Sequence, residues 1–194
     1  MGTGILIFGL NGAGKSTLGR ALAKRLRFSF IDDEDLFFPK TDARDPYAVS
    51  RTRVEAKACL LDRIKEREGF VLAAVKGDYG EGTDSLFQYA VWVQAPREIR
   101  LQRVRDRSFA RFGERMQQDG DLYETEEAFF RFVAARPEKA AEDWARRLTC
   151  PVLRIDGTRP VEESVRRIAA WIVTSCRRRT TSGLDCGGCG RLYL

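Results

Sequence analysis

The sequence of 194 residues contains no histidine and no long apolar run. The absence of histidine excludes Ser-His-Asp and Cys-His catalysis, and it excludes metal sites that use histidine. No apolar stretch approaches a length of about 18 residues, the minimum that indicates a membrane-spanning helix. The N-terminus has no basic region before an apolar stretch. We therefore expect no secretory signal, no membrane partner and a cytoplasmic location.

Cysteine is sparse and scattered. The five cysteines, an odd number, are spread from Cys59 to Cys189, which argues against a disulfide framework. Beyond Cys176 the sequence loses its hydrophobic periodicity and becomes rich in glycine, serine, threonine and arginine. We therefore predict one domain over residues 1–176 and a flexible, basic, cysteine-containing tail over residues 177–194.

The formal net charge of +6 is concentrated in two segments. Arginines gather in residues 100–115 and in the tail, while the rest of the chain is nearly balanced. Such a concentration indicates a local anion site better than the broad basic surface that is typical of nucleic-acid binding. We expect small anions, and not nucleic acid, as partners.

Short apolar runs alternate with segments of helical periodicity along the chain. Apolar residues from Leu18 to Leu26 recur every three or four positions, for example, as they do on one face of a helix. This alternation predicts an α/β fold with a parallel sheet that is covered by helices on both faces. The predicted strands are residues 4–8, 28–31, 70–75, 89–93 and 152–155.

The segment GLNGAGKST, residues 9–17, lies between the first predicted strand and a predicted helix. It matches G-x-x-x-x-G-K-[ST], a loop whose backbone N–H groups surround phosphate oxygens. We expect Lys15 to reach the β and γ phosphates of ATP and the Ser16 hydroxyl to bind Mg²⁺. A glycine-rich turn with a chance lysine is the alternative. The predicted nucleotide-binding residues of this segment are Gly9, Asn11, Gly12, Ala13, Gly14, Lys15, Ser16 and Thr17.

Four acidic residues, Asp32 to Asp35, follow the second predicted strand, at the edge of the sheet where ligands bind in α/β folds. Alternation along an extended stretch places Asp32 and Glu34 on one side. We predict that Asp32 lies near the metal and that Glu34 receives or orients the hydroxyl of the acceptor. An acidic turn that caps the next helix is the alternative.

Arginines from Arg100 to Arg115 repeat every three or four residues, so they form one stripe on a helix. Like charges at this spacing repel one another, and a bound polyphosphate would neutralise them. The segment predicts a lid over about residues 100–125 that closes over ATP and excludes water. A solvated charged face is the alternative. The arginines predicted to stabilise the transferred phosphoryl group are Arg103, Arg107 and Arg111.

These motifs, together with IDGTRPVEESVRRI at residues 155–168, resemble the P-loop small-molecule kinases: shikimate kinase, gluconate kinase and the nucleoside monophosphate kinases. The chain is similar in particular to uncharacterised bacterial ATP-binding proteins of this group. The resemblance implies a three-layer P-loop fold, a five-stranded parallel sheet in the order 2-3-1-4-5, and ATP with Mg²⁺. It also implies that the loop after the last strand lies against adenine, which assigns that role to Gly157, Thr158 and Arg159.

The acceptor site is less well defined by the sequence. In such kinases an arginine after the substrate-binding segment often holds an acceptor anion, and Arg51 and Arg53 are the candidates here. The segment VKGDYG, residues 75–80, matches neither the consecutive glycines of shikimate kinases nor the Asp-Gly-Phe-Pro-Arg of adenylate kinases. Lys76 and Asp78 either contact the acceptor or the metal, or form a turn.

We therefore interpret the chain as an ATP- and Mg²⁺-dependent kinase that acts on a small anionic metabolite or nucleotide. The Asn-Lys-x-Asp motif with which GTPases bind guanine is absent. Two alternatives stay open: an ATP-binding regulatory protein with little turnover, and a kinase or binder of nucleic-acid ends. The sequence does not decide between a monomer and a dimer.

Overall fold

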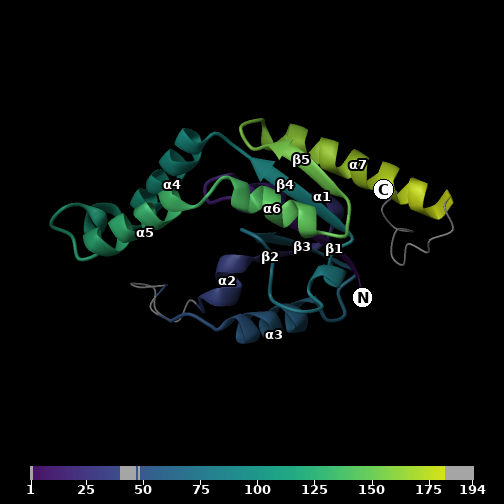
Figure 1. Cartoon of the computed structure of the whole chain (residues 1–194), viewed down its shortest axis with the longest axis horizontal. Coiled ribbons are helices and arrows are strands. Elements are labelled where there is room, and N and C mark those ends of the chain that lie inside the picture. Colours follow the sequence, from purple (N-terminus) through teal and green to yellow (C-terminus); the bar gives the residue numbers. More distant parts are fainter. Residues whose placement is uncertain (1, 40–46, 48, 182–194) are drawn as a thin grey trace.

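A five-stranded parallel sheet forms the centre of the computed structural model, which describes residues 2–39, 47 and 49–181 (Figure 1). The sheet order, β2-β3-β1-β4-β5, confirms the predicted order. Every neighbouring pair of strands is parallel. The strands are β1 (Thr3–Phe8), β2 (Ser29–Asp32), β3 (Gly69–Ala74), β4 (Tyr89–Gln94) and β5 (Val152–Asp156).

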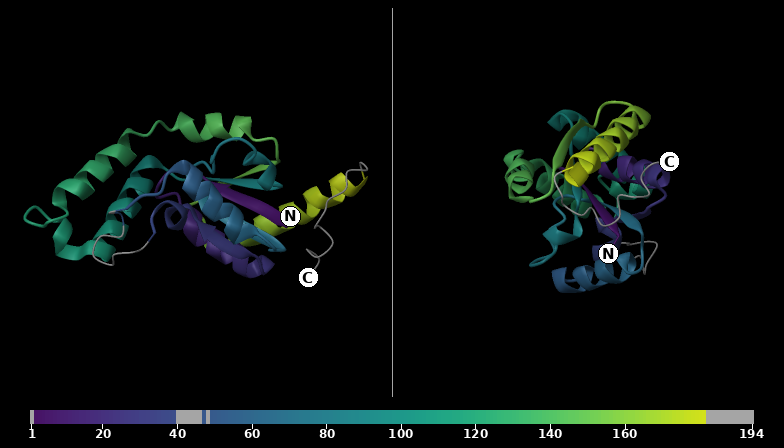
Figure 2. Two further views of the ribbon diagram at one scale, coloured as in Figure 1. Left: turned by 90° about the horizontal axis from the view of Figure 1, so that it is seen from below. Right: turned by 90° about the vertical axis from the view of Figure 1, so that its right-hand side faces the viewer.

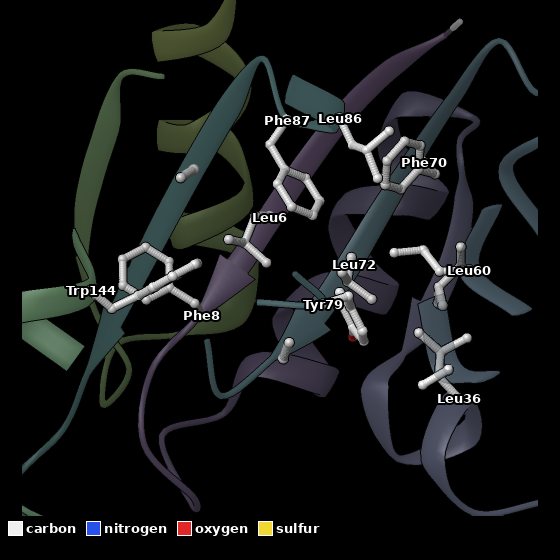
Figure 3. Packing of buried hydrophobic residues seen from close by; sticks show 14 of the residues in the cluster. Leu6, Phe8, Leu36, Leu60, Phe70, Leu72, Tyr79, Leu86, Phe87 and Trp144 are labelled. Atoms are coloured by element: carbon white, nitrogen blue, oxygen red, sulfur yellow. The ribbon is translucent and has the colours of Figure 1, made fainter. Parts of the chain in front are cut away.

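Helices cover both faces of the sheet, which explains why β1 and β3 are buried at every position. Successive residues of a strand point to opposite faces. Leu6 and Phe8 therefore face α2 (Asp33–Phe37), α3 (Arg53–Ile64) and α6 (Lys139–Arg147), as Figure 3 shows for part of this core. Ile5 and Ile7 face α1 (Lys15–Leu26) and α7 (Val161–Thr181). A short 3-10 helix, η1 (Asp84–Leu86), precedes β4.

Two helices project beyond the sheet as an arm, residues 97–135 (Figures 1 and 2). The arm consists of α4 (Arg97–Phe112), the 3-10 helix η2 (Gly113–Met116) and α5 (Tyr123–Ala135). Val104 of α4 packs against Phe130 and Val133 of α5 in a small cluster separate from the main cores. The predicted lid, about residues 100–125, covers most of α4, η2 and the start of α5, and its closure stays a prediction.

The last helix, α7, continues to Thr181, past the predicted domain boundary at Cys176. The sequence between Cys176 and Gly183 contains no glycine or proline, the residues that most disfavour a helix, so α7 can continue past Cys176. Cys176 itself is buried. The remainder of the predicted tail, with Cys186 and Cys189, lies outside the described residues. Within the described residues, none of the helices combines the length and the apolar character that crossing a bilayer requires.

Candidate active site

The loop between β1 and α1 is shaped by glycines. Gly12 and Gly14 have φ angles of 78° and 98°, which favour glycine. A Cβ atom on Gly12 would lie 2.1 Å from the carbonyl oxygen of Arg100, so the loop passes close to the start of the arm. Helix α1 begins at Lys15, directly after the loop, with no acidic side chain in its first turn. Its first N–H groups have no partner inside the helix, an arrangement that favours an anion.

Lys15 extends across this loop and donates from Nζ to the carbonyl oxygen of Leu10 at 3.0 Å. Burial and the neighbouring Arg107 lower the pKa of Lys15 to about 8. An ammonium group in such surroundings gains most from an anionic partner, because a phosphate would restore the solvation that burial removed.

The structure brings most of the predicted catalytic residues together in one cavity. This loop cavity has a volume of about 460 Å³ and adjoins the N-terminus of α1. Carboxylates, cations and a hydroxyl all border it, the groups that phosphoryl transfer uses. The predicted residues that line it are Gly12, Gly14, Lys15, Ser16, Thr17, Asp32, Glu34, Arg103 and Arg107.

The segment after β2 is helical and not extended, which corrects the predicted alternation of its acids. Asp32 is the N-cap of α2, and its Oδ1 accepts a hydrogen bond from the Glu34 N–H at 3.4 Å. A side-chain oxygen at this position satisfies a free N–H of the first turn, so the helix starts at Asp33. Asp32 and Glu34 nevertheless both line the loop cavity.

Asp33 is a site residue that the sequence analysis missed. It accepts a hydrogen bond from the Tyr79 hydroxyl, which follows β3. Burial raises the pKa of Asp33 to about 6, although the Tyr79 hydroxyl acts in the opposite direction. Asp33 borders a second cavity of about 430 Å³, which we call the aromatic cavity. The two cavities share Lys15, Ser16, Asp32, Glu34 and Arg107.

The arm supplies arginines to both cavities. Arg107 lines both of them, and no hydrogen bond or ion pair of its guanidinium is found among the described residues. Arg111 lines the aromatic cavity and donates to Glu34 Oε1 at 3.2 Å. Its guanidinium also lies 4.9 Å from the ring centre of Tyr47, which in turn donates to Glu34. Glu34 is therefore engaged with the arm.

The loop after β5 lies beside the glycine loop, and its contact with adenine stays a prediction. A Cβ atom on Gly157 would lie 2.2 Å from the carbonyl oxygen of Ala13. Arg103 donates to the carbonyl oxygen of Gly157 at 3.0 Å. Gly157 and Arg159 border a third cavity, of about 240 Å³. Thr158 does not line it and instead donates its hydroxyl to Asp156 at 2.7 Å, which stabilises the turn.

Of the predicted substrate residues, Glu34 lines the loop and aromatic cavities, and the other four lie outside them. Arg51 donates to the carbonyl oxygen of Leu36 at 3.0 Å, at the end of α2. Arg53 forms an ion pair with Asp78, while Lys76 is exposed. The substrate role of these four residues stays a prediction.

Arg136 was also missed by the sequence analysis. It follows α5 and donates to Asn11 Oδ1 at 3.1 Å, and thereby links the arm to the glycine loop. Its guanidinium lies 4.7 Å from the ring centre of Phe132. Both residues line the aromatic cavity. A cation 125 positions from the loop gave no local signal in the sequence.

Comparisons with known proteins identify the family and the fold of the chain. A family model described as an AAA domain, AAA_18, matches residues 5–119. The uncharacterised protein YqaC of Bacillus subtilis is 30% identical over 176 residues, which cover 87% of this chain and 96% of YqaC. A shikimate kinase of Burkholderia lata is 36% identical over 80 residues, 38% of this chain and 42% of that protein.

A solved structure shows the same fold. The shikimate kinase of Bacteroides thetaiotaomicron superimposes with a TM-score of 0.58 at 16% identity, and the match covers 88% of this chain and 98% of that one. These similarities confirm the resemblance to the P-loop small-molecule kinases that the sequence motifs indicate. Because the family model matches more than half of the sequence, the chain belongs to the AAA_18 family of P-loop domains.

Proposed function

We propose that this protein is a kinase that transfers the γ-phosphoryl group of ATP to a small molecule in a Mg²⁺-dependent reaction. One observation carries the proposal: the loop cavity and the aromatic cavity adjoin and share a lysine, a hydroxyl, carboxylates and an arginine. A phosphate donor in the first cavity and an acceptor in the second would meet at these shared groups. A protein that only senses ATP has no need for the second cavity.

The residues of the loop cavity fit ATP. The glycine loop and the start of α1 offer N–H groups to phosphate oxygens, and Lys15 reaches the same space. We assign adenine to the cavity beside Gly157 and Arg159. Arg103 lies between the two, since it lines both cavities.

The residues also fit Mg²⁺. Ser16 and Asp32 place a hydroxyl and a carboxylate on the loop cavity. Within the described part of the chain there is no group of three acidic or cysteine residues that would hold a metal by itself. This suits Mg²⁺, which binds few protein ligands and takes its others from water and phosphate. When bound, Mg²⁺ would supply positive charge to the phosphates.

The chemistry is then a direct transfer. The acceptor oxygen forms a bond to the γ phosphorus while the bond to the bridging oxygen of ADP breaks. We assign to Asp33 the role of receiving the acceptor proton, because its carboxylate lines the aromatic cavity and its pKa of about 6 suits a base at neutral pH. Glu34 holds Arg111 in place. Arg103 and Arg107 stabilise the charge on the phosphoryl group.

Release of ADP from Mg·ATP by the purified protein tests the proposal. We expect release that depends on an acceptor from a panel of nucleosides, nucleoside monophosphates, shikimate and gluconate. Lys15→Ala should abolish it, while Lys24→Ala, an exposed position on the same helix, should not. Slow release that is indifferent to every acceptor, while ATP still binds, would identify a regulatory ATP-binding protein instead.

A further inference from the structure

The aromatic cavity has the size and the walls of a site for a planar ligand. Its volume of about 430 Å³ falls in the range of about 300–1,000 Å³ that is typical of small-molecule sites. Aromatic rings line it from the segment after β2 on one side and from the arm on the other. These residues are Phe37, Phe38, Tyr47, Phe112, Phe129 and Phe132.

One carboxylate in the wall is buried without its full set of hydrogen bonds. Glu126 is only 6% exposed, and its Oε2 atom has no hydrogen-bond partner among the described residues. Glu126 lies on the buried face of α5 together with Phe130 and Val133, where an apolar residue is expected. A buried carboxylate oxygen without a donor is unfavourable. Because Glu126 borders the aromatic cavity, a ligand there could supply the missing donor once the carboxyl group turns toward it.

The cations around the cavity do not supply that partner. Arg111 donates to Glu34, and Arg136 donates to Asn11. Arg107 lines the cavity but forms no hydrogen bond with Glu126. The terminal torsion of a glutamate is broad, so the carboxyl group of Glu126 can turn an oxygen toward a ligand.

We propose that the phosphate acceptor is a nucleoside or a nucleoside monophosphate whose heteroaromatic base donates an N–H to Glu126. The flat base would lie among the aromatic side chains, which stack with bases of any sequence. Its sugar hydroxyl or phosphate would point toward Asp33 and Lys15, which line the same cavity. The proposal rests on the proposed function, because it names the acceptor of that transfer.

The same wall disfavours aliphatic hydroxy acids. Shikimate and gluconate have no flat aromatic face to contact the rings. Neither compound has an N–H group that could donate to Glu126, so the buried carboxylate would keep its unsatisfied oxygen. We therefore expect the aromatic cavity to bind a different class of compound from shikimate, although the chain resembles a shikimate kinase in fold.

Equilibrium binding and turnover with one panel test the proposal. The probes are adenosine, cytidine, guanosine, their 5′-monophosphates, shikimate and gluconate, each measured with the full chain and Mg·ATP or a non-hydrolysable ATP analogue. We expect at least one nucleoside or monophosphate to bind and to accept phosphate. For the best ligand, the analogue in which alkyl groups replace the N–H donors of the base should bind more weakly.

The variant Glu126→Met removes the acceptor oxygens and keeps the length of the side chain. It should weaken the best ligand about tenfold to a hundredfold, the value of a hydrogen bond to a charged group, and it should leave ATP affinity unchanged. It should also raise the melting temperature of the free protein, because an unsatisfied buried group is lost. Glu124→Met, at an exposed position two residues earlier on α5, is the matched control and should change neither.

The outcomes separate this proposal from the proposed function. Phosphoryl transfer to shikimate or gluconate, without binding of any nucleoside compound, would support the proposed kinase activity and contradict the proposed acceptor class. Binding of a nucleoside that Glu126→Met does not weaken would also overturn it. Binding of a nucleoside compound that depends on Glu126, without phosphoryl transfer to any acceptor, would contradict the proposed kinase activity and support the base-binding site.

Discussion

Arg111 on the arm and Glu34 beside the sheet form an ion pair, with Nη1 3.2 Å from Oε1 across 77 positions of the sequence. The Arg111 guanidinium also lies 4.9 Å from the ring centre of Tyr47. These contacts join the outer end of α4 to α2, and the aromatic cavity lies where they meet. The pair therefore fixes the distance between the two walls of that cavity.

Removal of this pair should affect catalysis more than stability. Both side chains are about one-third exposed, so Arg111→Ala should lower the free energy of unfolding by less than about 1 kcal/mol. The same change should lower kcat/KM about tenfold to a hundredfold, because the walls and the reacting groups lose their alignment. Urea unfolding and ADP release measure the two effects. Arg115→Ala, which breaks an ion pair with Asp121 within the arm, should have little effect on activity. An equal loss in both variants would contradict this prediction.

The rate should depend on pH through two groups. Asp33 accepts a proton only when it is ionised, so activity should rise as pH increases through about 6. Lys15 attracts phosphate only when it is protonated, so activity should fall as pH increases through about 8. The profile of kcat/KM should therefore be bell-shaped with its maximum near neutral pH. A profile without a decline on the acidic side would exclude Asp33 as the base.

The acidic limb of this profile should respond to Tyr79. Its hydroxyl donates to Asp33 and lowers the pKa of that carboxyl, against the larger effect of burial. Tyr79→Phe removes the donor and keeps the ring, so the pKa of Asp33 should rise and the acidic limb should move to higher pH. The basic limb, which belongs to Lys15, should stay in place. Movement of both limbs together would indicate a general disturbance of the site and contradict this assignment.

The fold could be predicted because its signals are local. The match of residues 9–17 to a known loop, and the apolar runs that became β1 and β3, depend only on neighbouring residues. The strand order followed from the resemblance. Lys15, Ser16, Asp32 and Glu34 were predicted in the same way, since each directly follows a strand or a loop of recognised type.

The remainder of the site depends on contacts between distant segments. Asp33 differs from its acidic neighbours because α2 turns it toward Tyr79, 46 positions later. In an extended segment Asp33 would have pointed to the opposite side from Glu34. Because a helix begins at Asp33, the alternation of an extended segment does not apply there. Glu126 did carry a local signal, a charge on the apolar face of α5, and only the structure shows that its carboxylate oxygen lacks a partner.

Two glycines with nearly the same φ angle provide a measure of how closely the loop and the arm approach. Gly12 and Gly82 have φ angles of 78° and 77°, so an alanine at either position should be strained by about 1–2 kcal/mol. A Cβ atom on Gly82 has open space around it, whereas one on Gly12 would meet the Arg100 carbonyl oxygen at 2.1 Å. Gly12→Ala should therefore lower the free energy of unfolding by about 1–3 kcal/mol more than Gly82→Ala does.

The same two glycines also allow an effect on stability to be distinguished from an effect on ATP binding. Arg100 lies in the first turn of α4, so a displacement at Gly12 should move the base of the arm and the arginines that follow it. Gly12→Ala should consequently lose ATP affinity, while Gly82→Ala should keep it. Urea unfolding and equilibrium binding of ATP on both variants check the two expectations. Equal losses of stability, with ATP affinity retained in both, would show that the loop does not depend on close contact with the arm.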